Sequence, residues 1–100
     1  MFETASSPPY RIKPYTYRRA KTLGVTVRPS KNTQKKIDVF DKSGKKLASV
    51  GARGMNDYPT FIQKRGLSYA KTRRSLYKQR HEKDRHRVGT PGYYADQLLW

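Results

Sequence analysis

The sequence predicts an α+β fold, a small single domain in which a β-hairpin packs against short helices, with an extended N-terminal arm. Residues 36–50 alternate apolar and polar side chains on both sides of the turn residues 41–44, the pattern of two antiparallel strands. Residues 67–87 instead place apolar and basic side chains at helical spacing. A chain of 100 residues forms one domain at most, with a small core.

The N-terminal segment, residues 1–15, holds three of the six prolines and has no helical or strand period. We therefore expect an extended arm there and a compact domain over residues 16–100. The domain should begin with a short helix, 16–23, capped by Thr16 and stopped by Gly24. The buried stripe of this helix should contain Tyr17, Ala20 and Leu23.

The hairpin, 36–50, is the clearest local signal, and residues 25–27 are β-prone enough to add a third strand. Its lysines should point outward, while the core positions should be Ile37, Val39 and Leu47. After the hairpin, Asp57 suits a turn or a helix cap, with Pro59 in the first turn of a short helix that ends at Gly66. Its inward residues should be Phe61 and Ile62.

Two further helices are expected at the C-terminal end of the chain. The longer, 68–86, has Ser68 as a possible cap. One side of it carries Tyr69, Ala70, Arg73, Leu76, Tyr77 and Arg80. The second, 91–99, follows Thr90 and Pro91, which suit the N-cap and the first helical position.

Charge is the dominant compositional feature, because 23 Lys and Arg face 7 acidic residues for a net charge of +16. Such a surface attracts nucleic acid, anionic membranes or acidic proteins. The absence of cysteine excludes disulfides and thiolate chemistry. No apolar run is long enough to span a bilayer, and the first residues do not resemble a signal peptide, so we expect synthesis in cytosol or nucleus.

Three groups of residues are candidates for binding. An anionic surface or nucleic acid would contact the basic helix and its extension through Arg73, Arg74, Lys78, Arg80, Arg85 and Arg87, unless some of these pair with carboxylates. A partner protein would contact the arm and first helix through Tyr10, Arg11, Tyr15, Tyr17, Arg18 and Arg19. The C-terminal segment either folds back on the hairpin or enters another subunit through Tyr93, Tyr94, Leu98, Leu99 and Trp100.

Catalysis and metal binding find no support in the residue pattern. His81 and His86 are five residues apart, not the four that would place them on one helical face, and basic residues surround them. No paired carboxylates, phosphate-binding loop or activated nucleophile stands out. We therefore expect a protein that is not an enzyme, with no cofactor and no small-molecule substrate.

Several short motifs, in order, suggest a family. They are KKIDVF at 35–40, ASVG at 48–51, DYPT at 57–60, RRSLYKQRH at 73–81 and GYYADQLLW at 92–100. Over roughly residues 10–100 the chain resembles a family of small basic proteins encoded by large nucleocytoplasmic DNA viruses, including those of algae. The resemblance carries no catalytic residue.

The resemblance implies a virion component. A minor capsid protein on the inner face of an icosahedral capsid would bridge capsomers, with the major capsid protein and other minor capsid proteins as partners. Viral DNA or inner-membrane headgroups could also be contacted, and assembly would occur in the host cytoplasm. The alternative is a sequence-nonspecific nucleic-acid-binding protein, either a genome-condensing factor or one of ribosomal type.

Overall fold

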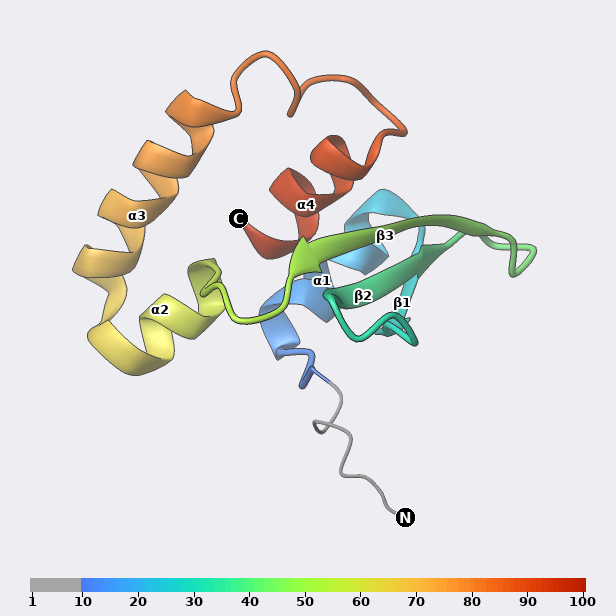
Figure 1. Cartoon of the computed structure of the whole chain (residues 1–100), viewed down its shortest axis with the longest axis horizontal. Helices are drawn as coiled ribbons and strands as arrows, with labels where there is room; N and C mark the ends of the chain where they lie inside the picture. The colour runs from blue at the N-terminus through green and yellow to red at the C-terminus, as the bar shows by residue number, and fades with distance from the viewer. Residues whose placement is uncertain (1–9) are drawn as a thin grey trace.

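The computed structural model describes residues 10–100, and the part of the predicted arm over residues 1–9 lies outside them. The described chain forms the predicted α+β fold, with a three-stranded antiparallel sheet in the order β1-β2-β3 and four helices (Figure 1). The strands are β1 (Thr26–Pro29), β2 (Lys35–Phe40) and β3 (Lys46–Ala52). The helices are α1 (Pro14–Leu23), α2 (Tyr58–Arg65), α3 (Leu67–Arg80) and α4 (Pro91–Leu99).

The hairpin and the third strand are confirmed, but one core position is wrong. Val39 pairs with Ala48 and Phe40 pairs with Lys46, so the register skips Leu47 at a bulge. The skipped side chain is 37% exposed, and the buried positions of β3 are Ala48 and Val50 instead. An extra residue in a strand changes which side chains face the core, because strand side chains alternate.

The expectation that every lysine of the hairpin points outward is also wrong. Lys36 is only 4% exposed, and its Nζ lies 2.9 Å from Oδ2 of Asp57. The same carboxylate accepts a hydrogen bond of 2.6 Å from the hydroxyl of Tyr10 and one of 3.0 Å from the backbone N–H of Thr60. Burial alone would raise the pKa of Asp57, but the ammonium of Lys36 and these hydrogen bonds hold it below its usual value.

Two apolar clusters stabilise the fold. The larger lies between the sheet and the helices α1 and α4, and its fully buried members include Ile37, Val39 and Leu98. The smaller lies between α2 and α3 around Phe61. Trp100 packs against both clusters, and its ring stacks on that of Tyr77 at 4.3 Å between centroids and 7° between planes.

Helix α1 begins at Pro14, two residues before the predicted start, because proline suits the first helical position. Thr16 is therefore not the N-cap but a buried residue whose hydroxyl donates to the carbonyl oxygen of Leu98 at 2.8 Å. Tyr17 is 52% exposed rather than part of the buried stripe. The predicted arm ends early as well, since Ile12 packs into the larger cluster.

Helices α2 and α4 begin and end as predicted, whereas α3 differs from its prediction at both ends. Asp57 caps α2 and Thr90 caps α4, as expected. Helix α3 has Gly66 rather than Ser68 at its N-cap position. It stops at Arg80, not at residue 86, because the polar stretch that follows has no apolar side chain to pack and forms turns instead.

Candidate anion-binding groove

The carboxylates of the described residues are largely engaged within the molecule. Asp38, Asp57 and Asp96 are buried. Asp57 pairs with Lys36, Asp96 pairs with Lys78 at 2.8 Å, and Asp38 accepts hydrogen bonds from two serine hydroxyls. Because 7 acidic residues cannot neutralise 23 basic ones, a large excess of positive charge is left after these ion pairs.

Asp96 connects α4 to α3 and to the turns after it. Besides the pair with Lys78, its other oxygen lies 3.7 Å from a guanidinium nitrogen of Arg85. Arg85 also pairs with Glu82 at 2.9 Å. These contacts hold Lys78 and Arg85 on the same side of α3, where each keeps part of its side chain exposed.

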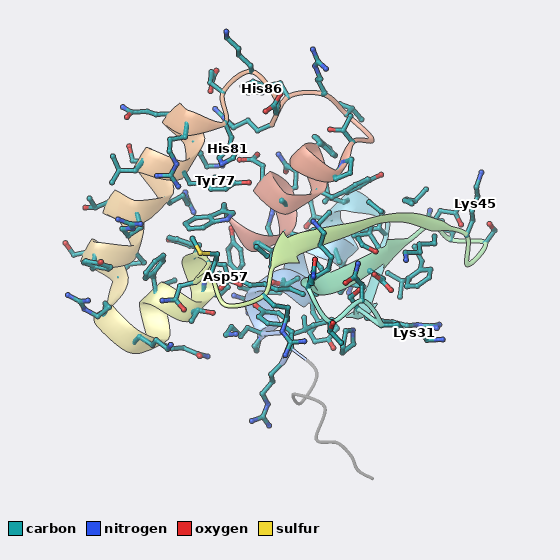
Figure 2. All side chains as sticks on the ribbon, viewed as in Figure 1. Lys31, Lys45, Asp57, Tyr77, His81 and His86 are labelled. Carbon is teal, nitrogen blue, oxygen red and sulfur yellow. The ribbon has the colours of Figure 1, made fainter. Side chains whose placement is uncertain are left out.

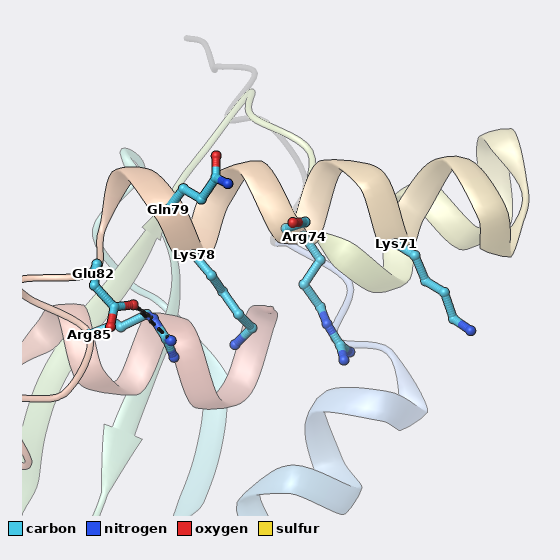
Figure 3. A pocket seen from close by; sticks show the side chains of 7 residues that line it. Lys71, Arg74, Lys78, Gln79, Glu82 and Arg85 are labelled. Atoms are coloured by element: carbon cyan, nitrogen blue, oxygen red, sulfur yellow. Dashed lines mark hydrogen bonds and ion pairs between the residues drawn. The ribbon is translucent and has the colours of Figure 1, made fainter.

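A groove of about 680 Å³ runs along this side of α3. Figure 3 shows Lys71, Arg74, Lys78 and Arg85 extending from the α3 side toward the space beside α1 and α4. We call it the cationic groove, lined by Lys71, Arg74, Ser75, Lys78, Gln79, Glu82 and Arg85. Lys78 and Arg85 are paired with Asp96 and Glu82, so Lys71 and Arg74 supply the charge with which the groove could bind an anionic chain or surface.

Arg74 joins this groove to α1. Its guanidinium lies 4.4 Å from the ring centroid of Tyr58, which in turn packs edge-on against Tyr15 at 5.3 Å. Burial raises the pKa of Tyr15, and the nearby guanidinium groups of Arg74 and Arg19 act in the opposite direction. The structure thus brings residues of α1 and α3, which are far apart in the sequence, to one side of the molecule.

Of the predicted partner-binding side chains, half are exposed and half are engaged internally. Tyr10 donates to Asp57, and Tyr15 is half-buried in α1. Arg19 donates from Nε to the carbonyl oxygen of Gln97 at 2.9 Å and from Nη2 to its Oε1 at 2.6 Å. The exposed ones are Arg11, Tyr17 and Arg18. Their contact with a partner stays a prediction.

The predicted basic set is divided between two sides of α3. Arg74, Lys78 and Arg85 line the cationic groove, whereas the guanidinium of Arg73 lies 5.5 Å from the ring of Phe61 on another side. The remaining members, Arg80 and Arg87, are exposed and do not line the groove. Sequence reasoning missed Lys71, although its spacing of three and seven residues from Arg74 and Lys78 places it on their helical face.

The C-terminal segment folds back on the sheet, which was one of the two alternatives. Tyr94, Leu98 and Leu99 are buried in the larger cluster. Tyr93 and Trp100 are partly buried and pack against it. The apolar stripe of α4 is therefore core.

No group of His, Cys, Asp and Glu that could hold a metal ion occurs within residues 10–100, and His86 instead contacts Glu82 at 3.0 Å. In the same part of the chain, none of the helices has the length and apolar character needed to cross a membrane. No family model, curated protein or solved structure matches the chain.

Proposed function

We propose that this protein is a non-enzymatic structural component of a large DNA virus particle, a minor capsid protein that bridges capsomers from the inner face of the shell. The viral setting rests on the resemblance of its motifs to the small basic proteins of such viruses. One observation carries the mode of binding, namely that most carboxylates of residues 10–100 contact groups of the same chain, while the net charge of +16 stays uncompensated. Such a surface attaches by charge complementarity.

The proposed partners are the major capsid protein and other minor capsid proteins. Their acidic surfaces would meet the exposed Tyr17 and Arg18 of α1 and the neighbouring cationic groove. Tyrosine and arginine are enriched at protein interfaces because they combine apolar area with hydrogen-bonding groups. On the inner face of a shell, the same groove could also contact viral DNA or the headgroups of an inner membrane.

A second candidate function is sequence-nonspecific nucleic-acid binding, which a specific feature of the groove favours. Lys71, Arg74 and Lys78 follow one line along α3. At a rise of about 1.5 Å per residue, the first and last are about 10 Å apart. Measured along the axis of a duplex, this span corresponds to about three phosphate steps of one strand, at a rise of roughly 3.4 Å each.

Fractionation of purified particles separates the two functions. Particles are opened, treated with nuclease and moderate salt, and the protein is quantified by mass spectrometry relative to the major capsid protein. A constant ratio that stays with the shell after nuclease treatment supports the capsid role. Release together with the nucleic acid would favour the second candidate, and absence from the particles would contradict the viral assignment.

The second candidate has its own binding test on the purified protein. Binding of a fluorescent duplex oligonucleotide is measured as a function of salt for the parent protein and for the double variant Lys71→Gln/Arg74→Gln. If the groove contacts phosphates, the slope of log affinity against log salt should fall by about two. Lys31→Gln, which removes an exposed charge at the other end of the molecule (Figure 2), serves as the control.

A further inference from the structure

A second groove, of about 660 Å³, lies on the opposite side of α3 from the cationic groove. One wall is the end of β3, residues 49–52, and the other is formed by Arg73, Tyr77 and Arg80 of α3. Leu99 and Trp100 also line it. Figure 2 shows Tyr77 and His81 on the side of α3 that faces α4. We call this space the edge groove.

The strand wall of the edge groove is an open sheet edge. The strand order β1-β2-β3 leaves β3 with a partner on one side only. Within the described chain, no backbone–backbone hydrogen bond outside the sheet involves residues 46–51, whereas the carbonyl oxygen of Ala52, at the end of the wall, accepts from the N–H of Met55 at 3.3 Å. An edge strand of this kind is a template on which an extended peptide can add a strand, with main-chain hydrogen bonds supplying part of the affinity.

The helix wall carries an unsatisfied donor. Nε of Arg73 is the one buried side-chain nitrogen or oxygen among the described residues that has no hydrogen-bond partner. Native proteins rarely leave such groups unpaired, and because Nε itself is screened from solvent, an outside acceptor would reach the more accessible part of this half-buried guanidinium or require a small shift of the side chain. A carboxylate is the acceptor that best matches the forked guanidinium geometry.

The charge of the lining selects the same kind of ligand. Basic side chains outnumber the single lining carboxylate, that of Asp84. Arg73 and Arg80 are seven residues apart in α3, which puts them on one face about 10 Å from each other. In an extended chain, side chains two residues apart share a face and lie about 7 Å from each other, a spacing that the long arginine side chains can match. Two acidic residues of one extended segment could therefore reach both arginines.

The groove also offers an apolar contact. The stacked rings of Tyr77 and Trp100 line it together with Phe61, whose centroid lies 6.0 Å from that of Trp100. Aromatic surface that is partly screened from water is where interface side chains contribute most to affinity. An apolar residue next to the acidic ones would be accommodated there.

We propose that the edge groove binds an extended acidic segment of a partner protein, which adds a strand to β3 and pairs a carboxylate with Arg73. This inference rests on the proposed structural role, and the segment would belong to the capsid partner. A nucleic acid would not use the strand edge. The groove differs in this respect from the cationic groove, where charge alone acts.

The test uses the full chain and a defined probe, an acetylated and amidated hexapeptide in which Glu alternates with Val and one Phe. Titration is followed in ¹⁵N–¹H NMR spectra, which report backbone amides and the Nε–H of arginine. We expect the amides of residues 49–52 and Nε–H of Arg73 to shift together. A shift confined to Lys71 and Arg74, or none at millimolar peptide, would overturn the proposal.

Two comparisons separate strand addition from simple charge attraction. A peptide of the same composition with N-methylated amides should bind at least about tenfold more weakly, because it cannot donate to the strand edge. Arg73→Gln should weaken the parent peptide about tenfold or more, whereas Lys31→Gln, equal in charge, should change it less than twofold. Equal affinities for the two peptides, or equal effects of the two variants, would refute strand addition.

Failure of this inference is distinguishable from failure of the proposed function. If the protein stays with the shell at a constant ratio but its NMR spectrum does not change with peptide, the structural role stands and the edge groove is not the means of attachment. If the protein is absent from particles but binds the peptide, the edge groove stands as a peptide-binding site and the capsid role is contradicted. An oligonucleotide that shifts residues 49–52 as the peptide does would contradict the assignment to a protein segment.

Discussion

Replacing Asp57 with alanine removes the group on which the N-terminal segment, the sheet and α2 converge. Its carboxylate accepts from Lys36 at 2.9 Å, Tyr10 at 2.6 Å and the N–H of Thr60 at 3.0 Å. The side chains of Asp57 and Lys36 are 1% and 5% exposed. The variant therefore leaves a buried ammonium without its counter-ion and α2 without its cap.

The expected loss of stability follows from these two effects. Breaking a buried ion pair by removing one partner costs about 3–5 kcal/mol. Losing an N-cap side chain costs about 1 kcal/mol. Allowing for overlap between the two, the free energy of unfolding should fall by about 4 kcal/mol, which is most of the stability of a small domain near the lower end of the usual range of roughly 5–15 kcal/mol.

Urea denaturation measures this loss, with the fluorescence of Trp100, the single tryptophan, as the reporter. The double variant Asp57→Ala/Lys36→Met should recover part of the stability, because it removes the unpaired ammonium as well. Asp41→Ala removes an exposed carboxylate that accepts hydrogen bonds from Ser43 and Lys45 in the hairpin turn, and as the comparison it should cost only a small part of the loss expected for Asp57→Ala. A loss below about 1 kcal/mol for Asp57→Ala, or no recovery in the double variant, would refute the reasoning.

Three further outcomes are expected. Because the pKa of Asp57 is lowered in the fold, its stabilisation is present above its usual pKa of 3.8 and is lost as pH falls through the lower folded value, so urea midpoints of the parent protein and Asp57→Asn should converge in acid. Gly51→Ala should lower the free energy of unfolding by about 2–4 kcal/mol in the same assay, because φ is +83° and a Cβ would lie 2.7 Å from Cδ1 of Leu99. Gly44→Ala, where φ is +88° but the space around the Cβ is open, should lower it by about 1 kcal/mol. Burial and the nearby carboxylate of Asp96 raise the pKa of Tyr77 to about 12. Tyr77→Phe should therefore remove a late transition from the alkaline absorbance titration at 295 nm. Because the pKa is higher in the folded state, the stability contributed by the neutral phenol should decrease from pH 10 upward.

The elements that could be predicted are those with a local chemical signal. The turn residues around Ser43 and the alternation beside them predict the hairpin, and the pair Thr90-Pro91 predicts the start of α4. The bulge at Leu47 has no such signal, because it depends on which residue of β2 meets which residue of β3. The end of α3 was also missed, since helical spacing of polar residues continues past Arg80 without any core for them to contact.

The candidate sites depend still more on tertiary contacts. The periodicity of α3 predicts a basic face, but not that Asp96 holds Lys78 on one side while Arg73 turns to the other. The burial of Lys36 could not be predicted either, because its partner lies 21 residues away, beyond the hairpin and the loop that follows it. The edge groove exists only because α3 is placed opposite the free edge of β3.

Cross-linking mass spectrometry on intact virus particles that contain this chain tests the central claim most directly. Lys21 on α1 and Lys71 on the cationic groove are exposed and would report neighbours on the proposed contact side. The capsid role predicts cross-links from both lysines to recurring positions on the major capsid protein or another minor capsid protein. Lysines that are protected by nucleic acid and give no recurring protein neighbour would contradict it.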